Sequence, residues 1–335
     1  MSGHRSGRVL DLHAHAVLEA GFNQAGRHGP ETGVDDGVPF FRIGNYRMKP
    51  MSYRGTVFMD VAKRLDLMAQ LGIDLQLLSP NPLTMFHRIE AELAARFCRV
   101  HNDAMAELVA KHPGKFLGAA ALPMQDVDAA MRELERAVKE LGLVAAHTGT
   151  RYPFPLDDPR LDDFYRTLVE LDVPLFLHPE STGGAEGPDD ARLGRFDFTI
   201  LLGYAYEETL AVATLVLGGV LDRHPDVDIC VSHGGGAMPY LIDHFERMGK
   251  LRNWEALHGG TFRAAMSRLW FDAHTEGDAA HDMLVSTLGT ERLVYGTNFG
   301  GWDTPRQVDD FAASLTPNAE RLLRLAPGGT ARVPG

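Results

Sequence analysis

The feature that most constrains the fold is an alternation that runs the length of the 335-residue chain. Short apolar segments, typical of buried strands, are separated by longer stretches with apolar residues three or four positions apart, typical of helices. Strands are predicted at residues 9–12, 74–79, 116–121, 143–147, 174–178, 228–233, 269–273 and 293–296. Strands joined by helices lie parallel, and eight repeats favour closure into a barrel. We therefore expect one (β/α)₈ TIM-barrel domain over residues 1–335. A doubly wound open sheet is the alternative, but no glycine-rich dinucleotide turn follows the first strand.

Two segments interrupt this alternation. Residues 17–55 are rich in glycine and polar residues, and residues 180–208 are rich in Gly, Asp and Pro. Both follow predicted strands, so in a barrel both rise over its C-terminal face. Long loops at that face usually cover an active site. The sequence therefore predicts two long loops over the C-terminal face.

The composition restricts the possible binding partners and the cellular compartment of the protein. A formal net charge of −12 argues against nucleic acid or an anionic membrane as a partner, because both attract basic surfaces. The chain shows no run of about 18 consecutive apolar residues, so we expect no membrane span. The N-terminus lacks an apolar signal-peptide region, and Cys98 and Cys230 fall within helix-like and strand-like patterns. Buried thiols of this kind indicate a reducing compartment, and a cytoplasmic protein is expected.

Three histidines at predicted strand ends indicate a metal site. His13 and His15 follow the first strand, and residues two apart on a strand point the same way. His178 ends the fifth strand at the same level of the barrel. Neutral imidazoles are the commonest ligands for zinc, and three protein ligands with one open position are typical of a catalytic site. These residues are predicted to bind one divalent ion, Zn²⁺ first and Mn²⁺ as the alternative.

A fourth histidine follows the sixth predicted strand in the run His233-Gly-Gly-Gly. The glycines allow backbone and ligand to approach closely, and they also suit a tight turn into a helix beginning near Met238. His233 is predicted to stand beside the metal as a catalytic acid or base. His147 and His274 follow the fourth and seventh strands. They are candidates for substrate contacts, with packing or support of the ligands as the alternative.

Several motifs resemble those of one enzyme family. They are HAH at 13–15, DLQLLSPNP at 74–82, LFLHPE at 175–180, CVSHGGGAMPY at 230–240 and LVYGTNFGGWD at 293–303. The chain resembles the amidohydrolase-related enzymes of the aminocarboxymuconate-semialdehyde decarboxylase type over nearly its whole length. This resemblance implies a (β/α)₈ barrel, one zinc or manganese ion and chemistry by metal-activated water. Members of the family are decarboxylases, hydratases and hydrolases of small carboxylic acids.

The resemblance also implies roles for single residues. His13, His15 and His178 match the metal ligands, and His233 matches the catalytic histidine. Arg47 resembles the loop arginine that holds the substrate carboxylate, a role that suits the two-pronged guanidinium group.

Two positions depart from the family pattern. The family has an aspartate at the end of the eighth strand, where this chain has Asn298. An amide oxygen can still bind a metal, but it carries no charge and accepts no proton near neutral pH. Proton transfer then falls to His233 or to Asp303. The family also borrows a substrate-binding arginine from a neighbouring subunit, and the matching position here is His244, which indicates a different substrate.

These observations support three functions. The leading prediction is a lyase, a metal-dependent decarboxylase of a small unsaturated or aromatic carboxylic acid that uses metal-activated water and His233. The second is hydrolysis of a C–C, amide or ester bond on the same barrel, which the missing aspartate favours. The third is a metal-free barrel that binds a ligand without catalysis. The resemblance further implies a homodimer.

Overall fold

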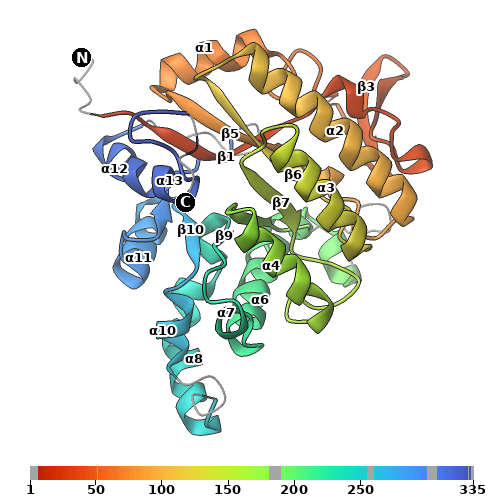
Figure 1. The fold of residues 1–335 in the computed structure, drawn as a ribbon. Helices are drawn as coiled ribbons and strands as arrows, with labels where there is room; N and C mark the ends of the chain where they lie inside the picture. Colours follow the sequence, from red (N-terminus) through yellow and green to blue (C-terminus); the bar gives the residue numbers. More distant parts are fainter. Residues whose placement is uncertain are drawn as a thin grey trace.

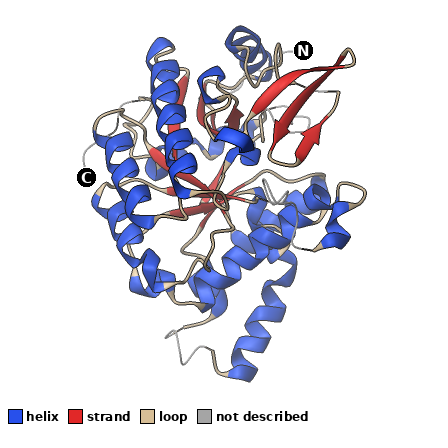
Figure 2. Ribbon diagram, turned by 90° about the vertical axis from the view of Figure 1, so that its right-hand side faces the viewer, coloured by secondary structure: helices blue, strands red, loops and turns tan. Residues whose placement is uncertain are grey.

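The computed structural model of the chain describes residues 7–50, 52–180, 190–254, 260–299, 308–330 and 332. Within them, an eight-stranded parallel sheet has the order β1-β5-β6-β7-β8-β9-β10-β11. Its strands are β1 (Leu10–Ala16), β5 (Leu75–Pro80), β6 (Phe116–Ala121), β7 (Ala145–Gly149), β8 (Leu175–His178), β9 (Ile229–Val231), β10 (Trp270–Asp272) and β11 (Leu293–Val294). Figure 2 shows these strands at the centre of the molecule with helices around them.

The sheet closes between its first and last strands. The Leu12 N–H donates to the carbonyl of Tyr295 at 2.9 Å. The Phe299 N–H donates to the His13 carbonyl at 3.1 Å, and the Phe299 carbonyl accepts from the His15 N–H at 2.9 Å. The predicted TIM barrel is therefore confirmed.

Helices connect successive strands of the barrel and cover its outside (Figure 1). They are α1 (Val61–Leu71), α2 (Ala91–Lys111), α3 (Val127–Lys139), α4 (Asp162–Glu170), α5 (Phe198–Leu201), α6 (Gly203–Leu217), α7 (Val220–Arg223), α8 (Met238–Arg252), α10 (Phe262–Met266), α11 (Asp278–Leu288), α12 (Asp310–Ser314) and α13 (Thr316–Leu322). Local capping sets the ends of α1. The Asp60 side chain accepts from the Lys63 N–H, and Gly72 ends the helix in the left-handed conformation with φ 81°.

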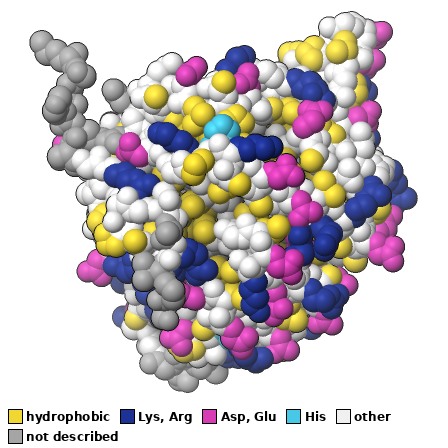
Figure 3. All heavy atoms as spheres, turned by 45° about the horizontal axis from the view of Figure 1, so that its top comes forward, with side chains coloured by type: hydrophobic (Ala, Val, Ile, Leu, Met, Phe, Trp, Pro, Cys, Tyr) yellow, Lys and Arg dark blue, Asp and Glu magenta, His cyan; other side chains and the backbone are white. Residues whose placement is uncertain are grey.

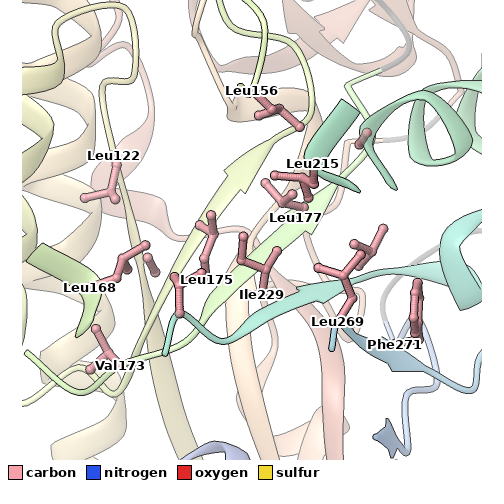
Figure 4. Packing of buried hydrophobic residues seen from close by; sticks show 14 of the residues in the cluster. Leu122, Leu156, Leu168, Val173, Leu175, Leu177, Leu215, Ile229, Leu269 and Phe271 are labelled. Atoms are coloured by element: carbon pink, nitrogen blue, oxygen red, sulfur yellow. The ribbon is translucent and has the colours of Figure 1, made fainter. Parts of the chain in front are cut away.

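The core has two layers because successive strand residues point to opposite sides of the barrel wall. Inside the barrel lies one cluster that includes Leu12, Leu77 and Trp270. Between the wall and the helices lies a larger cluster. Figure 4 shows part of it, with Leu175 and Ile229 from neighbouring strands packed beside other apolar side chains.

The prediction of a long loop at residues 17–55 is wrong in part, because this segment contains a three-stranded antiparallel sheet, β2-β3-β4. Its strands are β2 (Glu31–Asp35), β3 (Val38–Ile43) and β4 (Tyr46–Met48). The turn between β2 and β3 places Asp36 and Gly37 at φ 51° and 79°. An Asp-Gly pair between strands favours such a turn, so the sequence carried a signal for this hairpin. Figure 1 shows this added sheet beside α2 at one edge of the barrel.

The second predicted loop, residues 180–208, is also helical in its described part, because α5 and the start of α6 lie there. The stretch Phe198–Leu217 is long and apolar enough to cross a membrane by length and composition alone. In the structure its two helices have separate bounds, and α6 carries two buried carboxylates, Glu207 and Glu208. Such groups suit a helix that packs on a barrel with polar partners.

Candidate metal centre and active site

His13 and His15 lie inside β1, whereas the predicted strand ended before them. The strand continues to Ala16 because the bonds with Phe299 extend the ladder past both histidines. Side chains two apart on a strand share a face. The two rings accordingly meet, and their Nε2 atoms lie 3.1 Å apart.

His178, the last residue of β8, brings a third imidazole to the same point. One ligand atom from each of His13, His15 and His178 lies within 4.8 Å of the other two. The rings meet edge to face, with centroid separations of 4.9, 5.1 and 4.8 Å. All three side chains are buried. The structure therefore brings together the three predicted metal ligands.

The other ring nitrogen of each of these histidines is held by an oxygen atom. The pairs are His13 Nδ1 with Asp272 Oδ2 (2.8 Å), His15 Nδ1 with Ser79 Oγ (2.9 Å) and His178 Nδ1 with the Pro179 carbonyl (3.0 Å). A hydrogen at Nδ1 leaves the Nε2 lone pair free, which is the form that binds metals. The His178 Nε2 atom is buried without a hydrogen-bond partner. The donor set therefore fits a divalent ion.

Burial and neighbouring charges keep the rings of His15 and His178 neutral. Burial lowers the pKa of His15 and of His178 well below the usual range, and the neighbouring histidines lower both further. Metal ligands must be deprotonated before they bind. The two imidazoles are therefore ready to bind a cation at neutral pH.

His233 follows β9 in a tight turn. Its φ is 46°, and Gly234, Gly235 and Gly236 follow with φ of 62°, 74° and 67°. A Cβ atom at Gly236 would clash with the carbonyl of Ala205 in α6. The three glycines therefore permit both the turn and the close approach of α6.

The approach of α6 gives His233 a carboxylate partner. His233 Nδ1 lies 2.6 Å from Glu208 Oε1, which also accepts from the Ser232 hydroxyl at 2.5 Å. Glu208 is fully buried. The His233 ring lies beside the three ligands, with centroids 4.8 Å from His13 and 5.1 Å from His178. Glu208 holds Nδ1, and Nε2 lies on the opposite side of the ring.

Two further predicted residues border this centre. The His274 ring lies 5.9 Å from that of His13 and 5.5 Å from that of His233. The His147 ring lies 6.0 Å from those of His15 and His178. Burial lowers the pKa of His147 to about 3, so this ring is neutral. Both rings therefore lie next to the three predicted ligands.

Asn298 lies beside the predicted ligands in the wall of a cavity. It is buried and has φ 51°, a conformation that asparagine adopts more readily than most residues. The cavity is lined by His15, Tyr46, Tyr53, Phe58, Asn81, Pro82, Leu83, His178, Ile200, Tyr204 and Asn298. Four aromatic side chains thus face a space that reaches the metal centre.

Arg47 and His244 are not among the residues that line this cavity. Arg47 pairs with Asp35 at 3.1 Å and stacks on Phe40, while its neighbour Tyr46 lines the cavity. Successive strand residues point to opposite sides, which accounts for the difference. His244 is exposed on α8. Asp303 lies outside the described residues.

Sequence reasoning missed Asp272 and Glu208, the two carboxylates that hold His13 and His233. Asp272 ends β10, the seventh strand, and is buried. Its placement at a strand end was a usable signal. Glu208 fell in a segment predicted to be a loop, and the pair of charges within a largely apolar stretch was the corresponding signal.

Comparisons with known proteins agree with this arrangement. The amidohydrolase family model matches residues 10–329. Gamma-resorcylate decarboxylase from Rhizobium sp. (strain MTP-10005) is 30% identical over 323 residues, which cover 88% of this chain and 91% of that protein. The 2-amino-3-carboxymuconate-6-semialdehyde decarboxylase of Dictyostelium discoideum is 28% identical over 68% of this chain. That match spans 63% of the Dictyostelium protein, less than two thirds.

The fold has a counterpart among solved structures. A dihydroxybenzoic acid decarboxylase from Polaromonas sp. JS666, solved with manganese and the inhibitor 2-nitroresorcinol, superposes with a TM-score of 0.74 and 23% identity. The superposition covers 95% of this chain and 97% of that one. At 23% identity the structural similarity shows the fold alone. Family membership is shown by the family model and by the Rhizobium relative. This chain belongs to the amidohydrolase family of enzymes.

Proposed function

We propose that this enzyme is a metal-dependent decarboxylase of a small aromatic or unsaturated carboxylic acid. The observation that carries the proposal is the convergence of His13, His15 and His178 beside the His233–Glu208 pair, at the floor of an aromatic cavity. The decarboxylase names of the relatives support the same reaction.

One divalent ion would be held by the three imidazoles, with the amide oxygen of Asn298 as a further ligand. When bound, such an ion polarises a substrate oxygen and lowers the pKa of water. Zn²⁺ suits the nitrogen ligands, and the manganese in the Polaromonas enzyme makes Mn²⁺ the second candidate.

His233 would supply the proton that the reaction consumes. Decarboxylation breaks the bond between the carboxylate carbon and the substrate, and the bonding electron pair stays on the substrate carbon. A proton from His233 Nε2 then forms the new C–H bond, so that R–COO⁻ and H⁺ become R–H and CO₂. Glu208 holds the opposite nitrogen and thereby keeps Nε2 turned toward the substrate.

The cavity wall supports an aromatic substrate. Tyr46, Tyr53, Phe58 and Tyr204 provide flat apolar surfaces for a ring, and the phenol hydroxyls provide hydrogen-bonding groups. His147 and His274 would contact polar substituents from the barrel side. Arg47 would bind the carboxylate only after leaving Asp35, so we place the carboxylate at the metal instead.

Hydrolysis is the second candidate, and Asn298 is the observation that favours it. An amide at this position cannot carry a proton to carbon, which leaves His233 as the acid in a decarboxylation. In hydrolysis, water supplies both the nucleophile and the proton, so one base suffices.

We also propose a cytoplasmic homodimer that acts on small molecules. Both cysteines are free and buried, as expected of a reduced protein. Figure 3 shows acidic and basic side chains interspersed over one face, which suits neither nucleic acid nor an anionic membrane. Apolar side chains exposed on α5, α6 and α8, and at Leu202 between α5 and α6, suit contact with a second copy. They are Leu201, Leu202, Tyr206, Leu210, Tyr240 and Leu251.

The experiment is turnover of candidate acids, such as dihydroxybenzoates, by enzyme loaded with Zn²⁺ or Mn²⁺. We expect release of one CO₂ per product and, in D₂O, one deuterium at the carbon that lost the carboxylate. Turnover without CO₂, with oxygen from labelled water in the product, would replace the proposal with hydrolysis. Enzyme that binds neither metal would contradict both and support a non-catalytic barrel.

A further inference from the structure

Asp272 is a buried carboxylate bonded to a ring of the predicted metal triad. Its Oδ2 atom lies 2.8 Å from His13 Nδ1, and its Oδ1 accepts from the backbone N–H of His274 at 3.0 Å. Its side chain is only 5% exposed. Both carboxylate oxygens are therefore engaged, and one of them is directed at a metal ligand.

The donor set itself carries no negative charge. Three neutral imidazoles and the amide of Asn298 leave a divalent cation with its full charge in a buried site. A buried charge is costly unless an opposite charge lies near it. Asp272 is a buried carboxylate that hydrogen-bonds to a ring of the triad. Its charge would act on a bound metal through one imidazole.

The contact between Asp272 and His13 depends on a glycine in the chain segment that passes between them. Asp272 belongs to β10 and His13 to β1, and the chain that continues β11 passes between these strands. A Cβ at Gly296 on that chain would lie 2.7 Å from the Cβ of His13 and 3.1 Å from that of Asp272. The first of these distances is shorter than real Cβ atoms show. Glycine at 296 therefore lets the carboxylate reach across the eighth strand, and Asn298 follows two residues later.

We propose that Asp272 supplies, through His13, the negative charge that residue 298 does not provide, so that positions 272 and 298 are interchangeable locations for one carboxylate at this metal centre. The inference rests on the proposed metal-dependent function. It makes Asp272 a positioning residue for the metal, and it predicts that moving the charge from 272 to 298 conserves metal affinity.

The test measures Zn²⁺ and Mn²⁺ affinity by competition with a chromophoric chelator, without any assay of turnover. The proteins are the wild type, Asp272→Asn, Asn298→Asp and the double variant. Partners that orient a metal-bound histidine contribute about 10- to 100-fold to affinity, so we expect a loss of that size for Asp272→Asn. Asn298→Asp alone should bind more tightly than the wild type. The double variant should return to within about threefold of the wild type, because the total charge is restored.

Asp11→Asn is the matched control. Asp11 is a fully buried aspartate on the same strand as His13. It accepts from the side chains of Gln76 and Thr297 and from the backbone N–H groups of His13 and Thr297, but it is bonded to no imidazole nitrogen. Its variant should keep wild-type metal affinity. An equal loss in Asp11→Asn would overturn the inference, because any buried charge would then have the same effect.

Other outcomes are equally decisive. Unchanged affinity in Asp272→Asn contradicts the inference, and so does a double variant that stays as weak as Asp272→Asn. If Asp272→Asn fails to fold, Asn298→Asp alone decides, since unchanged affinity there means that residue 298 cannot hold the charge. A wild type that binds no metal contradicts the proposed function instead, so the two failures are distinguishable.

Discussion

The rim of the barrel and the added sheet β2-β3-β4 both carry residues predicted to act on a substrate, but they hold them differently. At the rim, His13 and His233 are each fixed by a carboxylate from another element, at 2.8 and 2.6 Å. In the added sheet, Arg47 is 38% exposed and pairs with Asp35 of the same sheet. The rim therefore presents fixed groups to a shared centre, whereas the sheet presents Tyr46 to the cavity and turns Arg47 away from it.

The difference shows which site residues can be predicted from the sequence. Parallel strands 4.7–4.9 Å apart bring their ends to one rim, so a histidine at a strand end has few places to point. A short antiparallel sheet offers two faces, and the choice between them depends on what packs below. The variants below probe this contrast in order of expected effect.

The largest effect is expected from His178→Ala. Loss of a direct ligand should exceed the roughly 10- to 100-fold effect of supporting residues on metal affinity. Metal content should fall below about 0.1 equivalent, and activity should vanish with it. Elemental analysis and a turnover assay on the same sample measure both. His101→Ala is the control, because His101 is equally buried on α2 but is not a proposed ligand. This variant should retain bound metal. A His178→Ala enzyme that still contains metal would show that this rim residue is not a required ligand.

His233→Ala should separate chemistry from metal binding. We expect a fall in kcat of about 10²- to 10⁴-fold, typical of a lost acid or base, with metal content unchanged. Glu208→Gln should lower kcat less and leave KM nearly unchanged, because the ring keeps a hydrogen-bonding neighbour. Steady-state kinetics with elemental analysis checks both variants. Full activity in His233→Ala would show that this rim residue has no part in the reaction.

The pH dependence of stability should distinguish the buried carboxylate Glu207 of α6 from the exposed carboxylate Asp35 of the added sheet. Burial raises the pKa of Glu207 to about 7, whereas Lys49 lowers the pKa of exposed Asp35. The folded pKa of Glu207 lies above its unfolded value, so its contribution to stability is complete at low pH and is lost between about pH 4.5 and 7. That loss amounts to about 3 kcal/mol. Glu207→Gln should flatten this part of the profile in urea titrations. The same slope in both proteins would show that Glu207 is not its origin.

The smallest effect is expected from Arg47→Ala. Exposed ion pairs contribute about 0–1 kcal/mol, so stability should barely change, and KM should rise by less than about threefold. Tyr46→Phe is the companion variant within the same strand, and it should affect KM more because Tyr46 lines the cavity. A large rise in KM for Arg47→Ala at constant kcat would restore the arginine as the carboxylate ligand and break the contrast between the two regions.

Much of the barrel was predictable because its signals are local. The predicted bounds of the third strand coincide with those of β6, Phe116–Ala121, and the helix expected near Met238 is α8. The errors lie where the chain departs from the repeat. The hairpin at Asp36 and Gly37 was hidden by the polar composition around it. The apolar helix α6 followed directly on a segment rich in glycine and proline, which masked its start.

The sequence alone determined the alternation of strands and helices, the His13 and His15 pair, and the glycine turn after His233. These features follow from the periods of a strand and a helix, which involve only near neighbours in the chain. Tertiary structure decided the partners. Asp272 reaches His13 across 259 positions, and Glu208 reaches His233 because α6 packs against a turn without side chains. Such pairings depend on barrel closure and close packing, which bring together residues that no local pattern connects.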